Sequence, residues 1–340
     1  MYHSFLMALL MLFFSWINRF ACRLQDLSIR LNLRPPYKAP LPVVSIGNIT
    51  HGGSGKTPLA IAMLSFLLEN GYRPALISRG YKGRWEQDGG ILSLGNGLLG
   101  NCEEAGDEAV MAARAVPRAG VFLGKHRLLS CRRAYEKGFY PAVLDDGFQH
   151  RRLARDIDIV LCDRTHGWEL RESPAALARA DFLLLNRGLG SGERHRLESL
   201  APRAHCYSYE TVPDSLIRLG AKSTMPAGDA AKERAVAFSA IARPHRFYSL
   251  LERTGIVPIA RISFPDHHAY PESSRRRIRR MYEEKDGSIL ITTEKDAVKL
   301  SSMPFFANLP VYYLKIALEV DGGFYEEVLI RLAELNDREP

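Results

Sequence analysis

The chain has 340 residues, of which 46% are hydrophobic and 25% are charged, and its formal net charge is +8. This composition is ordinary for a globular protein, and the length predicts about two domains with ample chain for a core. The five cysteines are scattered and form no C-x-x-C pair, which argues against a disulfide framework and a structural metal and favours a reducing compartment. The positive charge admits nucleic acid or an anionic membrane as a partner, but there is no zinc-finger spacing and no RNP-type motif.

The first feature along the chain is an apolar run without charge, from residue 5 to residue 17. It falls short of the roughly 20 residues that a spanning helix needs. A signal peptide carries basic residues before its apolar run, whereas here Arg19, Arg23, Arg30 and Arg34 follow it. We expect residues 1–34 to contain a helix that lies in the cytoplasmic membrane interface. A helix docked on the protein's own core and a short true span are the alternatives.

A glycine-rich loop stands between a predicted strand and a predicted helix. Val43, Val44 and Ile46 predict a buried strand, and apolar helical spacing begins after Thr57. Strand, loop and helix N-terminus in this order form a phosphate cradle, in which a lysine reaches the β- and γ-phosphates and a threonine hydroxyl ligands Mg²⁺. The predicted nucleotide-binding residues are Thr50, His51, Gly52, Gly53, Ser54, Gly55, Lys56, Thr57 and Pro58.

The loop departs at one position from the pattern G-x-x-x-x-G-K-[ST], because Thr50 stands where the pattern has glycine. An ordinary glycine-rich turn is therefore the alternative interpretation. Pro58 is compatible with both, since a proline costs little in the first turn of a helix.

Further apolar runs alternate with helical patterns. Strands are expected at 74–80, 121–124, 141–147, 157–163 and 182–186, helices near 109–113 and 127–137, and a loop or hairpin at 81–100. This alternation predicts an α/β fold with a parallel, doubly wound sheet. Residues 188–203 are polar and predict a surface connection. A smaller α/β unit begins near residue 234, with strands at 236–239, 289–293 and 311–314 and helices at 246–254 and 324–335.

Two acids, Asp145 and Asp146, end an apolar strand downstream of the glycine loop. A carboxylate in this position can hold Mg²⁺ beside the phosphates. A helix cap or a turn is the alternative, since Asp-Gly is common in turns. Gln149 and His150 follow and offer donors to a phosphate or a sugar, unless they belong to a solvated basic turn.

Two weaker signals lie elsewhere. Asp107 and Glu108 start a helix, where acids are expected for the helix dipole alone. His267 and His268 follow Asp266 and are candidates for metal ligands, a general base or surface polar groups, and the sequence alone favours the last of these.

Taken together, these motifs resemble one family, the tetraacyldisaccharide 4′-kinases, which are the lipid A 4′-kinases of Gram-negative bacteria. The apolar N-terminal segment fits this family too, and the resemblance covers nearly the whole chain. It is carried by residues 47–58, 78–81, 106–108, 145–150, 153–156, 240–244, 264–267 and 293–299.

The resemblance implies ATP- and Mg²⁺-dependent phosphorylation of the 4′-hydroxyl of a tetraacylated glucosamine disaccharide 1-phosphate, a late step of lipid A biosynthesis that gives lipid IVA. It implies Asp107 as the base on the sugar hydroxyl, His267 as the group that tunes it, and Lys56 on the transferring phosphate. The implied metal ligands are Thr57, Asp145, Asp146 and Glu172, and the implied substrate contacts are Tyr81, Glu108, Gln149 and His150.

Two departures from the family pattern qualify the resemblance. The stretch 168–174 is shorter than in the family, which affects the metal role of Glu172. Ala240 stands where the family tends to have glycine, which affects the local turn geometry and not the chemistry.

The resemblance also implies a domain plan. Residues 1–34 form the membrane-associated helix, 35–232 the P-loop kinase domain, and 233–340 a smaller C-terminal α/β domain that closes over the active-site cleft. We expect a monomer, peripheral or monotopic, on the cytoplasmic side of the inner membrane, with an acylated disaccharide lipid as its partner and no nucleic acid.

The alternative function is a membrane-associated P-loop regulatory NTPase that binds a protein partner. A guanine-specific Asn-Lys-x-Asp motif would favour it. The chain carries Thr293-Glu-Lys-Asp296 instead, which lacks the asparagine.

Overall fold

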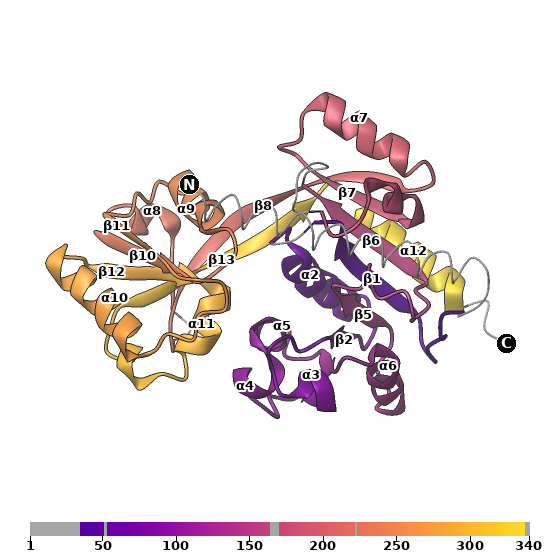
Figure 1. The fold of residues 1–340 in the computed structure, drawn as a ribbon, viewed down its shortest axis with the longest axis horizontal. Helices are drawn as coiled ribbons and strands as arrows, with labels where there is room; N and C mark the ends of the chain where they lie inside the picture. Colours follow the sequence, from indigo (N-terminus) through magenta and orange to yellow (C-terminus); the bar gives the residue numbers. More distant parts are fainter. Residues whose placement is uncertain (1–34, 51–52, 164–169, 222, 337–340) are drawn as a thin grey trace, which may run out of the picture. The chain divides into compact units, whose positions relative to one another are not determined.

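The computed structural model describes residues 35–50, 53–163, 170–221 and 223–336. The chain forms two compact units, which are best followed by their element labels in Figure 1. Unit 1 comprises Met1–Ala105, Ala112–Glu210 and Glu319–Pro340, and unit 2 comprises Gly106–Met111 and Thr211–Leu318. The helix expected within residues 1–34 lies outside the described residues, and the predicted domain boundaries stay a prediction.

Unit 1 is built on a sheet with the strand order β8-β7-β6-β1-β5-β2-β4-β3. All neighbours are parallel except β3 and β4, which pair antiparallel. The strands are β1 (Val43–Asn48), β2 (Ala75–Ser78), β3 (Gly90–Leu94), β4 (Gly120–Leu123), β5 (Ala142–Asp145), β6 (Ile157–Cys162), β7 (Phe182–Asn186) and β8 (His205–Arg218). The expected parallel α/β architecture is therefore confirmed at this level.

The helices of unit 1 follow its strands along the chain. They are α2 (Lys56–Glu69), α3 (Trp85–Asp88), α4 (Cys102–Ala105), the last turn of α5 (Asp107–Ala115), α6 (Arg127–Glu136), the 3-10 helix η1 (Pro174–Arg179), α7 (Ser191–Leu200) and α12 (Phe324–Asn336). In the described residues, no helix of either unit is long and apolar enough to cross a membrane.

Strand β1 is the centre of unit 1, flanked by β5 on one side and β6 on the other, and all of its residues are buried. Its buried β-branched residues Val43, Val44 and Ile46 are typical of a parallel strand that is covered on both faces. One core cluster packs Cys131 and Ala134 of α6 against β1, β2 and β5, and another packs Leu177 and Leu197 against β6 and β7.

The turn after β5 lies directly on the end of β1. A Cβ atom on Gly47 would stand 2.4 Å from Cβ of Phe148 and 2.9 Å from its backbone nitrogen, so only glycine fits there. The backbone N–H of Gly147 donates to the carbonyl of Ile46 at 3.0 Å. Asp146 enters this turn with φ 54, in the left-handed region that aspartate tolerates better than most residues.

Unit 2 has the parallel strand order β11-β10-β12-β13. Its core clusters lie against α9, through Phe247 and Leu251, and against α10, through Ile278. Its elements are β9 (Thr224–Met225), α8 (Ala227–Ala230), β10 (Ala235–Ser239), α9 (Pro244–Arg253), β11 (Ala260–Ser263), α10 (Glu272–Glu284), β12 (Ile289–Thr293), α11 (Glu294–Leu300), η2 (Pro304–Phe306) and β13 (Val311–Val320).

Some elements differ from the prediction. Residues 188–203 contain helix α7 rather than a surface connection, and residues 81–100 contain a short helix as well as a strand. Only Leu197 of α7 is buried, so the helix shows no apolar periodicity that a sequence pattern could detect. Strands β8 and β11 and helices α10 and α11 were not predicted, and β13 continues six residues beyond the expected end, to Val320.

Candidate active site

The amino group of Lys56, the first residue of α2, is held at the end of strand β1. Its Nζ donates to Oδ1 of Asn48 at 3.1 Å and lies 3.3 Å from Oδ1 of Asp146. Gly55 caps the helix with φ 91, a conformation that glycine adopts without strain. The lysine is thus placed where a phosphate at the helix N-terminus would lie.

Asn48 is a fully buried amide that organises the loop. Its Nδ2 donates to Oγ of Ser54 at 2.8 Å and to Oγ1 of Thr50 at 3.2 Å, while its side-chain oxygen accepts from Lys56. Its backbone carbonyl accepts from Nε2 of Gln149 at 2.7 Å. The side chain of Asn48 therefore ties both flanks of the glycine loop to the end of β1, and its backbone carbonyl ties the turn after β5 to the same point.

The rest of the predicted loop falls into two groups. His51 and Gly52 lie outside the described residues. Gly53 is exposed, whereas Thr57 and Pro58 occupy the first turn of α2 and are half-buried.

Asp145 and Asp146 lie at the carboxyl end of β5, where Asp145 pairs in register with Ile46 of β1. Asp145 is buried, whereas 40% of the Asp146 side chain is exposed. The guanidinium of Arg171 reaches both carboxylate oxygens of Asp146, at 2.8 and 3.0 Å. Burial raises the pKa of Asp146, but the charges of Lys56 and Arg171 outweigh it and hold the pKa well below its usual range.

Glu172 has a different environment from the two aspartates. It is 1% exposed, and its Oε2 accepts from Arg151 at 2.6 Å and from Arg179 at 3.0 Å. Two guanidinium groups on one buried carboxylate form a structural ion pair, because each charge needs the other once water is excluded. These contacts give Glu172 a role that needs no metal.

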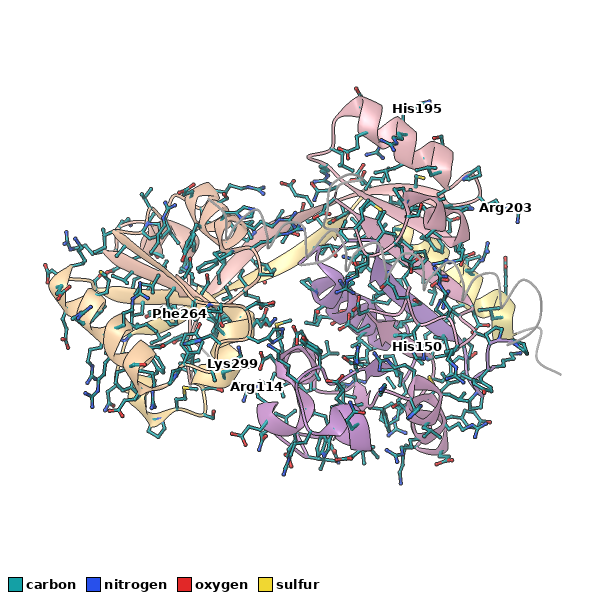
Figure 2. The ribbon with its side chains drawn as sticks, in the orientation of Figure 1. Arg114, His150, His195, Arg203, Phe264 and Lys299 are labelled. Carbon is teal, nitrogen blue, oxygen red and sulfur yellow. The ribbon has the colours of Figure 1, made fainter. Side chains whose placement is uncertain are left out.

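His150 and Tyr81 complete the predicted residues of unit 1. His150, labelled in Figure 2, lies in the turn after β5. Burial, followed by the charges of Arg127, Arg155 and Arg152, lowers the pKa of His150 to about 4, so its ring is neutral at neutral pH. Tyr81 is 49% exposed and has the ammonium of Lys82 over its ring.

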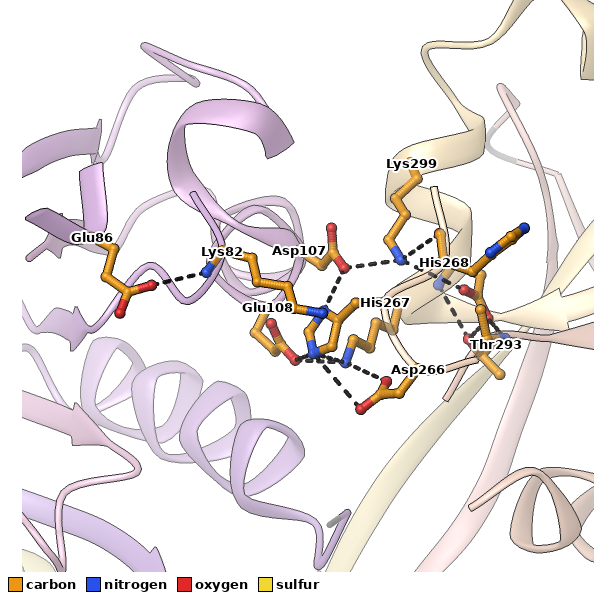
Figure 3. A network of polar contacts seen from close by, with 12 residues as sticks. Lys82, Glu86, Asp107, Glu108, Asp266, His267, His268, Thr293 and Lys299 are labelled. Atoms are coloured by element: carbon orange, nitrogen blue, oxygen red, sulfur yellow. Dashed lines mark hydrogen bonds and ion pairs between the residues drawn. The ribbon is translucent and has the colours of Figure 1, made fainter. Parts of the chain in front are cut away.

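The predicted base and histidine meet within unit 2, as Figure 3 shows. Oδ2 of Asp107, in the first turn of α5, lies 3.1 Å from Nδ1 of His267 and 3.0 Å from Nζ of Lys299. All three side chains are nearly buried. His267 lies in the loop after β11 and has φ 62, a left-handed conformation.

Glu108 belongs to the same network but contacts a different lysine. Its Oε1 lies 2.7 Å from Nζ of Lys295, which also contacts Asp266 at 3.3 Å and Nε2 of His267 at 3.1 Å. The sequence alone favoured His267 as a surface polar group, and the buried pairing with Asp107 corrects that interpretation.

Opposing effects act on Asp107. Burial raises its pKa, but the hydrogen bond from His267 and the charge of Lys299 outweigh burial, so the pKa lies below its ordinary value. The carboxylate is therefore ionised at neutral pH and able to accept a proton.

Several residues in these networks were not predicted: Asn48, Arg127, Arg171, Lys295 and Lys299. Arg127 is a buried guanidinium near the acid pair, and burial lowers its pKa to about 10, which leaves it charged at neutral pH. Lys295 and Lys299 stand four residues apart in a stretch that begins with a threonine cap, so helical spacing was the signal that could have paired them.

A lysine at a helix N-terminus after a parallel strand, with carboxylates at the end of the neighbouring strand, defines the class of proteins that bind nucleotide phosphates. The comparisons with known proteins are more specific. The model of the tetraacyldisaccharide-1-P 4′-kinase family matches residues 7–333, and the chain belongs to this family.

Individual relatives carry the same family name. The tetraacyldisaccharide 4′-kinase of Syntrophus aciditrophicus is 37% identical, with 92% of this chain and 89% of that protein covered. The tetraacyldisaccharide 4′-kinase of Desulfotalea psychrophila is 34% identical, with 93% and 94% covered. The crystal structure of LpxK from Aquifex aeolicus, an "apo" form in complex with ATP, matches with a TM-score of 0.73 at 27% identity, covering 95% of this chain and 96% of that one.

The ion pairs of Glu172 generate a prediction. Glu172→Gln should lower the free energy of unfolding by about 3–5 kcal/mol, because the buried Arg151 and the partly buried Arg179 lose their counter-charge. Chemical denaturation measures this, with Glu198→Gln as the control, since the Arg194–Glu198 pair is a more exposed ion pair on α7. Unchanged stability together with a raised Mg²⁺ requirement would instead support the metal role.

Proposed function

We propose that this chain catalyses the ATP-dependent phosphorylation of the 4′-hydroxyl of a tetraacylated glucosamine disaccharide 1-phosphate, giving lipid IVA. The observation that carries this is the family match over residues 7–333. The placement of Lys56 beside Asn48 and Asp146 supports a nucleotide in the same unit. Family membership favours a kinase over a regulatory NTPase.

The proposed architecture follows the same resemblance. Unit 1 would serve as a P-loop kinase-like, doubly wound domain, and the smaller α/β domain, residues 233–340, would close over the active-site cleft. The parallel sheet of unit 1 and the phosphate-loop geometry at the end of β1 support this assignment. We propose a monomer as the working form.

The reaction needs few groups from the protein. The 4′-oxygen attacks the γ-phosphorus of ATP, the bond from that phosphorus to the β-phosphate oxygen breaks, ADP leaves, and the hydroxyl proton passes to Asp107. Phosphoryl transfer depends mainly on positioning and charge stabilisation, so an ionised carboxylate of modest basicity suffices as the base. Lys56 would contact the transferring phosphate once ATP displaces it from Asp146.

The donor set near the loop fits magnesium. Thr57 in the first turn of α2 and Asp145 and Asp146 at the end of β5 offer hard oxygen donors. No cluster of three or more metal-binding side chains occurs in the described part of the chain, which agrees with a cation that takes one or two carboxylates and completes its shell with phosphate and water. Magnesium would supply neutralisation of charge on the β- and γ-phosphates. We leave Glu172 out of the proposed site because its carboxylate is buried and paired with both arginines, whereas 40% of the Asp146 side chain is exposed.

The remaining predicted contacts are assigned to substrate. Gln149 donates one Nε2 hydrogen to the carbonyl of Asn48, so its second N–H and its side-chain carbonyl are left for a ligand. A neutral His150 ring would donate an N–H hydrogen bond to the substrate but would bring no positive charge to it. Tyr81 is exposed enough to meet a sugar, and Glu108 would act through its pair with Lys295.

A direct assay tests the proposed activity. Protein incubated with γ-labelled ATP, Mg²⁺ and detergent-dispersed tetraacyl disaccharide 1-phosphate should transfer label to the 4′-position, mapped by NMR of the product. Lys56→Ala should reduce turnover by orders of magnitude with the fold intact, because the transition state loses its cation. Lys232→Ala, an exposed lysine of unit 2, serves as control. Wild-type turnover in a folded Lys56→Ala protein would contradict the cradle assignment.

We also propose that residues 1–34 bind the cytoplasmic face of the inner membrane. Each arginine near an anionic surface contributes about 1 kcal/mol, and the apolar run adds buried area. Deleting residues 1–20 should release the protein from anionic vesicles in a flotation assay and impair use of lipid substrate more than ATP binding. Vesicle binding that survives the deletion would count against this role.

The base assignment predicts a non-additive pair. Asp107→Ala should reduce turnover by about 10²–10⁴-fold with little change in ATP affinity, because the proton acceptor is lost. His267→Ala should cost less alone and almost nothing more in the Asp107→Ala background, since the two groups act as a unit. A double-mutant cycle on turnover measures this. Fully additive losses would mean that His267 acts independently of Asp107.

A further inference from the structure

Helix α11 is fixed to the backbone that carries His267. The Oγ1 of Thr293 caps the helix by accepting from the backbone N–H of Asp296 at 3.1 Å. The buried carboxylate of Asp296 accepts from the N–H of Ala240 at 2.9 Å, and the carbonyl of Ala240 accepts from the N–H of His267 at 3.2 Å. Ala240 thus joins the helix to the histidine through both of its backbone groups.

Two lysines of α11 reach the base and the histidine. Lys295 and Lys299 are four residues apart, so they project from the same face of the helix. Nζ of Lys295 lies 3.1 Å from Nε2 of His267, and Nζ of Lys299 lies 3.0 Å from Oδ2 of Asp107 and 3.2 Å from the carbonyl of His268. Figure 3 shows Lys299 pointing at Asp107.

The partners of His267 determine its tautomer. An ammonium group only donates, so Nε2 of His267 must accept from Lys295. The proton of the neutral ring then belongs to Nδ1, which donates to Oδ2 of Asp107 at 3.1 Å. A lysine therefore selects the tautomer that directs an N–H at the base.

The donors on Asp107 leave its two oxygens unequal. His267 and Lys299 both contact Oδ2. In the described part of the chain, Oδ1 of Asp107 accepts a hydrogen bond from neither His267 nor Lys299. Holding a carboxylate by one oxygen fixes its plane and leaves the other oxygen to take a proton.

We propose that α11 positions the catalytic base, with Lys299 anchoring Oδ2 of Asp107 and Lys295 fixing the tautomer of His267, so that Oδ1 accepts the substrate proton. This rests on the proposed function, in which Asp107 is the base. Lys295 and Lys299 are positioning residues, since each acts through Asp107 or His267.

Other charges face these groups. Glu108 and Asp266 each have a carboxylate oxygen 3.8 Å from Nε2 of His267, and Lys295 contacts both of these carboxylates. Oδ1 of Asp296 lies 3.9 Å from Nζ of Lys299, so Asp296 and Asp107 share the positive charge of this lysine. The lysines therefore balance three carboxylates around one imidazole and one base.

The first experiment does not depend on turnover. NMR of full-length protein, with ¹³C-labelled aspartate carboxyls and ¹⁵N-labelled histidine rings, reports the Asp107 titration and the His267 tautomer, assigned with Asp107→Asn and His267→Gln. Lys299→Met should raise the pKa of Asp107 by about one unit or more, because an opposite charge within 4–6 Å is removed. Lys299→Arg should restore it, and Lys285→Met, at an exposed lysine that follows α10, should leave it unchanged.

The tautomer has its own variants. Lys295→Met should mix the two His267 tautomers, whereas Lys295→Arg, whose guanidinium only donates, should keep Nε2 as the acceptor. The tautomer signals of the Lys295 variants can be read even if Lys299→Met folds poorly. An unchanged tautomer in Lys295→Met together with an unchanged Asp107 titration in Lys299→Met would overturn the proposal.

Turnover separates this inference from the proposed function. In Lys299→Met the acid limb of the kcat/KM profile should move to higher pH by the same amount as the Asp107 titration, whereas a purely structural role would lower the rate equally at every pH. If Asp107→Asn keeps wild-type turnover, the base role fails, and the NMR shifts still decide whether α11 positions Asp107.

Discussion

The parallel pairing of β1 with its neighbours is the constraint on which the nucleotide side of the molecule depends. Carboxyl ends of parallel strands emerge at the same edge of a sheet, so the loop after β1 and the turn after β5 leave the sheet together. The register that sets Ile46 beside Asp145 fixes how closely the loop after β1 and the turn after β5 approach each other. Gly47 then allows the turn to rest on β1, and Lys56 meets Asp146 as a consequence.

Much of this arrangement could be predicted because its signals are local. The apolar run of β1, the glycines after it and the two acids after β5 are contiguous in sequence, and each pattern has a structural meaning of its own. The pairing of Asp107 with His267 had no such signal, since 160 residues separate them. Only the resemblance to a family indicated this pairing, because sequence periodicity does not predict which distant loops will contact each other.

What could not be predicted depends on tertiary burial. An arginine or glutamate in a polar stretch gives no sign that it will be buried, yet Glu172 is enclosed by two arginines. Helix α11 was missed for a related reason, since it is seven residues long and its lysines look like solvent-exposed charges. The sequence shows which ionisable group each of these residues carries. The electrostatic environment that gives the group a role exists only in the folded chain.

The two left-handed residues of the site suggest how that environment is maintained. Asp146 and His267 each adopt a positive φ, which costs about 1–3 kcal/mol outside glycine and persists only where the surroundings impose it. In both cases the constraint is a backbone hydrogen bond at or beside the residue, from Gly147 to Ile46 in one unit and from His267 to Ala240 in the other. Each side chain then meets cations that oppose its movement, Lys56 and Arg171 for the first and Lys295 for the second. The backbone sets the direction and the charges limit the rotamers, so each unit carries its chemical group preorganised before substrate binds.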